Sequence, residues 1–231
     1  MKITEAIILA GGLGTRLRET VPDLPKCMAP VNEKPFISYV IDYFLLQGIE
    51  HFIFALGYKN EVMTLYINEN YPDLSKKYCV EDEPLGTGGA IKLACQQATT
   101  RNVLVANGDT LFKIDLNEIA AFHTQTGAHC TVSLKFVENF DRYGVVDIND
   151  NCAITSFKEK AFYEQGLING GVYGLHVEHF LEEELPYKFS FEKDYLEAYY
   201  TKRRMFGIEQ DGYFIDIGIK EDFERAQEEL R

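Results

Sequence analysis

The first half of the chain alternates between short apolar runs and helical stretches. The run from Glu5 to Ala10 is almost wholly apolar and leads into glycines, as a buried parallel strand does. Residues 35–48 carry apolar side chains at helical spacing between an opening proline and a closing glycine. Strands joined by helical crossovers predict a parallel sheet covered by helices on both faces. The further elements predicted in this half are strands over residues 51–56, 78–81 and 102–106 and helices over residues 61–69 and 90–98.

The second half of the chain predicts antiparallel additions to that sheet. Residues 130–137 alternate between apolar and polar side chains, and residues 145–148 and 153–158 flank the hairpin-turn sequence Asn149-Asp150-Asn151. The predicted fold class is therefore α/β, with a Rossmann-like mixed, mostly parallel sheet flanked by helices and an antiparallel lobe. No linker rich in Pro, Gly or Ser divides the chain, so we expect one domain over residues 1–231 with lobes over 1–115 and 116–231. The remaining predicted elements are strands over residues 167–175 and 214–217 and helices near 176–184, 191–200 and 219–230.

The charge balance argues against several classes of partner. Lys and Arg number 23 against 36 Asp and Glu, which gives a formal net charge of −13. Nucleic-acid binding and anionic-membrane binding both need a basic surface, so neither is expected. The five cysteines are widely spaced with no C-x-x-C pair, no apolar run approaches a membrane span, and the first residues lack a signal-peptide pattern. We therefore expect a cytoplasmic protein with reduced thiols.

The first predicted strand runs into a glycine-rich turn, Leu9-Ala10-Gly11-Gly12-Leu13-Gly14-Thr15-Arg16-Leu17. Successive backbone N–H groups in such a turn form a cradle for anions, and ligands of open α/β sheets bind at this edge. Leu17 stands where a dinucleotide-binding turn needs a small residue, and the Gly-Lys-Ser/Thr of a P-loop is absent. Arg16 and Lys26 instead place two cations next to the turn, which favours phosphoryl or nucleotidyl chemistry. A tight strand–helix turn with surface charges is the alternative that glycine spacing alone leaves open.

The run from Gly11 to Leu17, followed by Pro25-Lys26, resembles the signature of the sugar-phosphate nucleotidyltransferases, also called nucleotide-sugar pyrophosphorylases. The resemblance covers essentially the whole chain, although Cys27 stands where many members have proline. It implies a GT-A-like fold and an enzyme that transfers a nucleotidyl group from a nucleoside triphosphate to a sugar 1-phosphate, releasing pyrophosphate. The lobe over residues 1–115 is then expected to bind the nucleotide and the lobe over 116–231 the sugar phosphate.

The resemblance also assigns the catalytic and metal residues. Arg16, Lys26 and Asp109 are expected to be catalytic, with the two cations stabilising the triphosphate and the charge that develops on it. Asp109 and Asp216 each end a predicted strand and are expected to hold Mg²⁺, which proteins often bind through one or two carboxylates and substrate phosphates. A helix cap or a turn is the alternative role for either aspartate alone.

The resemblance also indicates which residues bind the nucleotide and the sugar phosphate, and some candidate residues receive no such role. Ser190-Phe191-Glu192 and Asp194 also have a family counterpart but receive no role, since a helix cap explains them nearly as well. His176 and His179 are expected to be surface residues rather than metal ligands. Lys158 is a weaker alternative to Lys160 as the sugar-phosphate cation. The expected nucleotide-binding residues are Leu9, Gly11, Gly12, Gly14, Thr15, Glu81, Gly86 and Thr87, and the expected sugar-phosphate-binding residues are Gly144, Glu159, Lys160 and Asn169.

The motif details most resemble those of the D-glycero-α-D-manno-heptose-1-phosphate guanylyltransferases within this family. GTP is therefore the favoured nucleotide, and a homodimer is left open. The alternatives are mannose-1-phosphate guanylyltransferase, N-acetylmuramate-1-phosphate uridylyltransferase and glucose-1-phosphate thymidylyl- or cytidylyltransferase. The alternative from outside the enzymes is a catalytically silent regulatory subunit that binds nucleotide sugars; loss of Arg16, Lys26, Asp109 or Asp216 would favour it, and the sequence retains all four.

Overall fold

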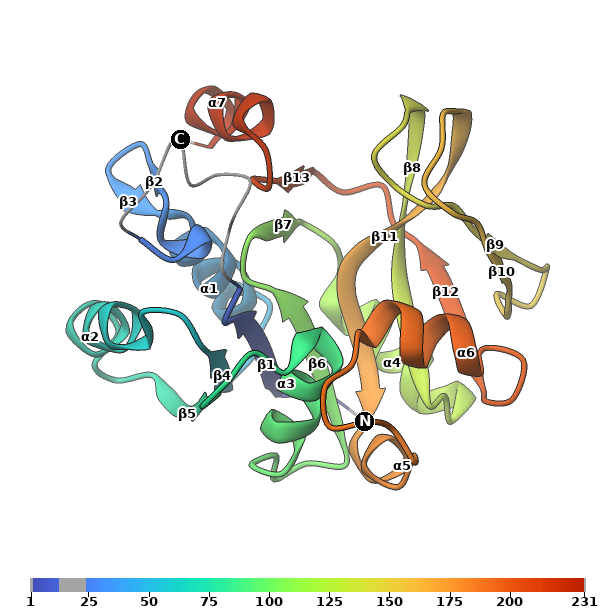
Figure 1. Ribbon diagram of the computed structural model, residues 1–231, viewed down its shortest axis with the longest axis horizontal. Coiled ribbons are helices and arrows are strands. Elements are labelled where there is room, and N and C mark those ends of the chain that lie inside the picture. The colour runs from blue at the N-terminus through green and yellow to red at the C-terminus, as the bar shows by residue number, and fades with distance from the viewer. Residues whose placement is uncertain (1, 13–23, 231) are drawn as a thin grey trace.

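The computed structural model describes residues 2–12 and 24–230 and is built around one mixed sheet (Figure 1). Seven strands hydrogen-bond in the order β12-β8-β11-β6-β1-β4-β5. All neighbouring pairs are parallel except those of β11, which runs antiparallel to both β6 and β8. The strands are β1 (Glu5–Ala10), β4 (His51–Leu56), β5 (Ser75–Val80), β6 (Asn102–Asn107), β8 (Cys130–Phe140), β11 (Tyr163–His176) and β12 (Met205–Glu209).

Helices and three small two-stranded sheets complete the fold (Figure 1). The helices are α1 (Phe36–Leu46), α2 (Asn60–Asn70), α3 (Gly86–Cys95), α4 (Leu116–Thr126), α5 (Val177–Leu181), α6 (Glu197–Tyr199) and α7 (Lys220–Glu229), with a 3₁₀ turn η1 (Lys26–Met28) and a π-helix η2 (Phe191–Leu196). The small sheets pair β2 (Pro30–Val31) with β3 (Lys34–Pro35), β9 (Val146–Ile148) with β10 (Ile154–Phe157), and β7 (Thr110–Phe112) with β13 (Phe214–Asp216).

The two faces of the main sheet are buried in separate hydrophobic clusters. Successive residues of a strand point to opposite faces, so Ile8 packs with α1 residues such as Phe36, while Ile7 packs on the other face with Tyr173 and Phe191. Burial of such a side chain stabilises the fold by about 1.5–3 kcal/mol. Burial on both faces explains why the strands in the first half read as continuous apolar runs.

The predicted fold class is confirmed, and most predicted elements occur within a few residues of their expected bounds. Residues 149–151 form the expected hairpin turn, and Gly48 follows α1 with φ +85°. The helix predicted over residues 90–98 begins and ends earlier than expected, because α3 spans Gly86–Cys95 and includes the glycines before residue 90. Helix α4 and strand β12 were not predicted. Asp115 caps α4 by accepting from the N–H groups of Asn117 and Glu118, and Gly127 ends the helix with φ +56°.

The second half of the chain is hydrogen-bonded into the same sheet as the first, through β8, β11 and β12. The division into lobes at residues 115 and 116 stays a prediction. None of the helices in the described ranges is both long and apolar enough to cross a bilayer.

Candidate active site

Lys26 joins two carboxylates that are distant in the sequence. Its ammonium lies 2.5 Å from Asp109 Oδ2 and 3.5 Å from Asp216 Oδ1. The lysine belongs to η1, Asp109 follows β6, and Asp216 ends β13. The structure thus brings together three of the four residues on which the catalytic and metal predictions depend. The fourth, Arg16, lies outside the described residues.

Backbone pairing positions the two aspartates. Strands β7 and β13 run antiparallel, which places Asp216 opposite Thr110, directly after Asp109. The N–H of Ile217 donates to the Asp109 carbonyl at 3.1 Å, and the N–H of Gly218 donates to Asp216 Oδ1 at 2.7 Å. A Cβ at Gly218 would lie 2.8 Å from both Asp216 Oδ1 and Lys26 Nζ, so a larger residue there would displace these two side chains.

The charges of this cluster depend on one another. Burial works to lower the pKa of Lys26, but the neighbouring Asp109 and Asp216 outweigh it and raise that pKa. Burial first, and then the charge of Asp109, raise the pKa of Asp216 above its usual range, although Lys26 and the N–H of Gly218 oppose the rise. Lys26 is therefore a permanent cation between two carboxylates that would otherwise repel each other.

The glycine turn lies beside this cluster. The Leu9 carbonyl accepts from the N–H of Gly108, which ties β1 to the segment carrying Asp109. A Cβ at Gly11 would lie 2.9 Å from Glu81 Oε1 and 3.1 Å from the N of Gly57, whereas a Cβ at Gly12 would meet no atom of the described residues within 4 Å. Gly12 thus presents open backbone, as a ligand cradle requires. The predicted nucleotide-binding residues Gly14 and Thr15 lie outside the described residues.

Glu81 bridges the glycine turn and the start of α3. Its Oε2 accepts from the N–H of Leu85 at 2.7 Å, and its other oxygen faces Gly11. Burial raises the pKa of Glu81, and the N–H of Leu85 partly offsets this by stabilising the carboxylate. A carboxylate therefore lies between the two glycine segments that were predicted to bind the nucleotide.

Gly86 and Thr87 have structural roles that the sequence did not reveal. Gly86 has φ +75°, and a Cβ there would lie 2.5 Å from the Phe189 carbonyl. The hydroxyl of Thr87 donates to Glu192 Oε2 at 2.7 Å and accepts from the N–H of Phe191 at 2.9 Å. These contacts join the first turn of α3 to Phe189, before η2, and to the first residues of η2, so Gly86 serves packing in addition to any nucleotide contact. The Thr87 hydroxyl is already engaged within the protein.

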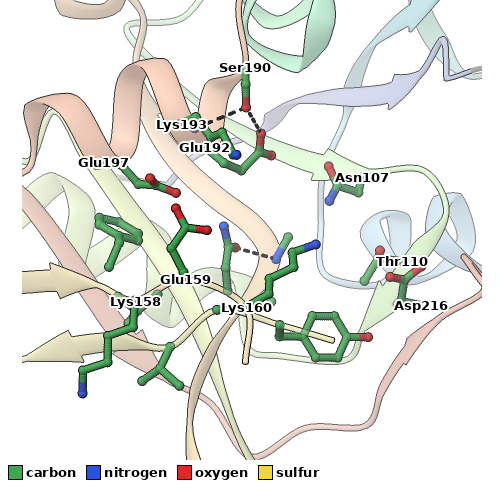
Figure 2. Close-up of a pocket in the computed structure, with 18 of the residues that line it drawn as sticks. Asn107, Thr110, Lys158, Glu159, Lys160, Ser190, Glu192, Lys193, Glu197 and Asp216 are labelled. Atoms are coloured by element: carbon green, nitrogen blue, oxygen red, sulfur yellow. Dashed lines mark hydrogen bonds between the residues drawn. The ribbon is translucent and has the colours of Figure 1, made fainter. Parts of the chain in front are cut away.

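A cavity of about 590 Å³ opens beside Asp216 (Figure 2). It is lined by all four predicted sugar-phosphate residues, which come from the segment before β9, the segment after β10 and strand β11. The lining residues are Asn107, Thr110, Tyr143, Gly144, Val145, Val146, Phe157, Lys158, Glu159, Lys160, Asn169, Gly170, Gly171, Tyr173, Ser190, Glu192, Lys193, Glu197, Phe214 and Asp216.

The neighbouring lysines Lys158 and Lys160 differ in their partners. Lys158 Nζ forms an ion pair with Asp147 at 2.9 Å, and its side chain points away from the other labelled residues in Figure 2. Lys160 has no ion pair within the described chain and points toward the middle of the cavity, beside Glu159 (Figure 2). Lys160 is therefore the better placed of the two for a phosphate, and its role in binding one stays a prediction.

Several cavity residues had no predicted role. Asn107 and Thr110 flank Gly108-Asp109 at the end of β6, so the strand-end pattern that singled out Asp109 could have found them. Glu192 and Lys193 belong to the motif that received no role, and η2 turns them toward the cavity (Figure 2). Glu197 begins α6 and carries no sequence signal. Its pKa is raised by burial and then by the facing carboxylate of Glu159.

The expectation of surface histidines was wrong for His176 and His179. Both are half-buried, the Nδ1 of His176 accepts from the backbone N–H of His179, and their rings stack with centroids 3.8 Å apart. His176 is the N-cap of α5, which accounts for the pair structurally. Within residues 2–12 and 24–230, neither these histidines nor any other His, Cys, Asp and Glu side chains form a group of three that could hold a metal ion.

Comparison with known proteins agrees with the geometry of the site in indicating nucleotidyl transfer. Residues 5–231 match the family described as Nucleotidyl transferase. A D-glycero-alpha-D-manno-heptose 1-phosphate guanylyltransferase of Aneurinibacillus thermoaerophilus is 47% identical over 98% of this chain and 98% of its own length. The enzyme of the same name from Campylobacter jejuni is 43% identical over 95% of this chain and 96% of its own.

A solved structure resembles the whole chain. The crystal structure of HddC from Yersinia pseudotuberculosis complexed with GMP-PN superposes with a TM-score of 0.87 at 34% identity, covering 99% of this chain and 100% of that one. That protein binds its nucleotide analogue on the fold described above.

Proposed function

This chain belongs to the nucleotidyl transferase family, and from that premise we propose that it transfers GMP from GTP to D-glycero-α-D-manno-heptose 1-phosphate. The products are pyrophosphate and a GDP-heptose, which we place in the cytoplasm as a precursor of surface polysaccharide. The observation that carries the proposal is the meeting of Lys26, Asp109 and Asp216 at one end of a cavity that holds the sugar-phosphate residues.

The reaction needs two anions to approach each other. An oxygen of the sugar phosphate attacks the α-phosphorus of GTP, and the bond from that phosphorus to the oxygen bridging to the β-phosphate breaks. Because the bonds that form and break all belong to the two substrates, the protein acts by positioning them and by stabilising charge. Lys26 at one end of the cavity and Lys160 within it supply cations from two sides, and Arg16 supplies a third in this proposal.

Asp109 and Asp216 fit a magnesium ion. Both carboxylates reach the ammonium of Lys26, so they converge on one place, and two carboxylates with substrate phosphates are a usual ligand set for Mg²⁺. When bound, the ion would neutralise charge on the phosphates. The two aspartates would hold it, and Lys26 would limit their repulsion in its absence.

The nucleotide is proposed to bind over the glycine turn. Leu9, Gly11, Gly12, Gly14 and Thr15 would surround the triphosphate and ribose, with the open backbone at Gly12 facing the phosphates. The carboxylate of Glu81 suits the N–H groups of guanine, since it is an acceptor only when ionised. The Gly86-Thr87 backbone would then border the base.

The sugar end is proposed to lie in the cavity. Lys160 would bind the phosphate, whereas Glu159 and Asn169 would bind sugar hydroxyls, and Gly144 allows the sugar to approach the chain. A Cβ at Gly144 would collide with the Lys158 carbonyl, so a larger residue would move this wall.

The test is a matrix of nucleoside triphosphates and sugar 1-phosphates with Mg²⁺, read by pyrophosphate release. We expect the largest kcat/KM for GTP with the heptose phosphate. Greater activity with mannose 1-phosphate, or with UTP or dTTP, would identify one of the alternative reactions. An absence of release across the whole matrix would contradict an enzyme and favour the silent regulatory subunit.

A further inference from the structure

An irregularity in the sheet lies at the wall of the cavity. Strand β11 pairs with β8 through Asn169 opposite Leu134 and through Tyr173 opposite Val132. The three residues between them face the single residue Ser133, whose hydroxyl donates to the Val172 carbonyl at 2.8 Å. This is a β-bulge, which leaves residues unpaired and redirects a side chain, and bulges are frequent beside active sites.

Glycines make this bulge possible. Gly171 has φ +74°, and a Cβ there would lie 2.8 Å from the Asn107 side-chain nitrogen. A Cβ at Gly170 would collide with the ring of Phe112. The bulge is therefore held from both sides, by the end of β6 and by β7, and its shape is fixed by packing.

The amide of Asn169 is held at both of its ends. Its Oδ1 accepts from the N–H of Gly171 at 3.0 Å, and its Nδ2 donates to the hydroxyl of Tyr173 at 2.9 Å. The Gly171 N–H is a donor, so it must face the amide oxygen rather than the nitrogen. No further hydrogen bond of this amide occurs in the described part of the chain. One N–H of Asn169 is therefore left over on a residue that lines the cavity.

Tyr173 is itself buried and closely packed. It is 1% exposed, and its ring packs edge-on against Phe191 with centroids 5.1 Å apart. Burial raises its pKa well above the usual range, so its hydroxyl stays protonated. A rigid tyrosine hydroxyl fixes the partner amide more tightly than a surface residue would.

We propose that Tyr173 is a positioning residue that holds the Asn169 amide with its free N–H toward the sugar. This rests on the proposed function, because it assumes that a sugar phosphate occupies the cavity. It assigns the chemistry of that contact: Asn169 donates to a hydroxyl oxygen of the sugar, whereas Glu159, which also lines the cavity, can only accept while ionised. A sugar hydroxyl between them would have its oxygen and its hydrogen both recognised.

The test is the variant Tyr173→Phe, which removes one hydroxyl and keeps the ring. We expect the KM for heptose 1-phosphate to rise about fivefold to tenfold, the size of one lost hydrogen bond. The KM for GTP and kcat should stay within about twofold of the wild type, since one neutral contact outside the phosphate site is changed. In the Asn169→Ala background, Tyr173→Phe should cause no further rise, because the amide it positions is absent.

Tyr195→Phe is the matched control. Tyr195 is buried in the same aromatic cluster, but its hydroxyl has no partner among the described residues and does not line the cavity. Loss of the Tyr195 hydroxyl should leave the KM for GTP and the KM for heptose 1-phosphate unchanged. An equal KM rise for Tyr173→Phe with and without Asn169 would overturn the proposal, since the tyrosine would then contact the sugar directly.

Asn169→Asp provides a second route if Tyr173→Phe fails to fold. The carboxylate still accepts from Gly171 but has no N–H, so the KM for the sugar phosphate should rise at least as much as in Asn169→Ala. A wild-type KM in Asn169→Asp would refute the donor role. If the wild-type protein uses no sugar phosphate at all, the proposed function fails together with this inference. If the wild type is active and the variants match it, this inference alone fails.

Discussion

The two ends of the cavity are built differently. At the Lys26 end, the charged side chains are paired with one another. Asp216 lies in the paired strand β13 and Asp109 directly precedes its partner β7, and both aspartates are 30% exposed. At the Glu197 end, the residues lie on a loop, a π-helix and the start of α6 and are more exposed, and the side chains of Glu159, Lys160 and Glu197 have no hydrogen-bond partner within the described residues. The first arrangement suits a reaction step that all substrates share. The second suits recognition of one sugar, because changes there do not disturb a charge network.

The largest expected effect comes from breaking the Lys26 end. Asp109→Asn removes one of the two carboxylates that fit magnesium, so we expect kcat to fall about a thousandfold, equal to several kcal/mol of lost transition-state stabilisation. Pyrophosphate release measures this. Asp211→Asn is the control, since that aspartate is fully exposed and pairs only with Lys135. A near-normal rate in Asp109→Asn would refute the metal assignment.

The next largest effect is expected from a change of Lys26, which separates its role in the reaction from its role between the two aspartates. Lys26→Met removes a preorganised cation, so kcat should fall about a hundredfold to a thousandfold. The same change leaves two carboxylates facing each other, so Mg²⁺ should raise the Tm of Lys26→Met more than that of the wild type. Thermal unfolding with and without Mg²⁺ measures this second property. Equal shifts in both proteins would mean that the ion does not bind between Asp109 and Asp216.

A smaller effect is expected in the cavity. Lys160→Ala should raise the KM for the sugar phosphate about tenfold to a hundredfold, because a hydrogen bond to a charged group is lost. Steady-state kinetics with each substrate varied in turn will show whether the KM for GTP is spared. Lys158→Ala is the matched control, since that lysine is paired with Asp147 and points out of the cavity. The reverse ranking of the two variants would assign the phosphate to Lys158.

The same contrast between the two ends describes what could be predicted from the sequence. The strand that carries Leu9 and the strand that precedes Asp109 are buried on both faces, so their apolar runs and the glycines after them identified them and placed their ends at one edge. The resemblance to the nucleotidyltransferases then supplied the roles of Lys26 and Asp216. The pairing of β7 with β13, which brings the two aspartates together, joins segments about a hundred residues apart and leaves no local pattern.

The Glu197 end was harder to predict for a physical reason. Glu192 and Lys193 face the cavity because η2 is a π-helix, and the segment before η2 is anchored to α3 through Phe189 and Thr87. Those contacts depend on packing between distant segments rather than on hydrophobic periodicity. By contrast, α4 had readable signals in Asp115 and Gly127 that the sequence analysis did not use.

The smallest expected effect tests the Glu197 end itself. Glu197 lies on an exposed wall, so Glu197→Gln should raise the KM for the heptose phosphate only about twofold to threefold, as for a solvent-screened contact. Burial and the facing Glu159 raise its pKa, so the carboxylate is lost earlier than an ordinary glutamate as pH falls. The wild-type KM should therefore climb on acidification, and Glu197→Gln should flatten that part of the profile. Glu184→Gln, on the exposed surface after α5, is the control. If the two pH profiles coincide, Glu197 does not contact the sugar, and recognition at this end depends on Glu159 and Asn169.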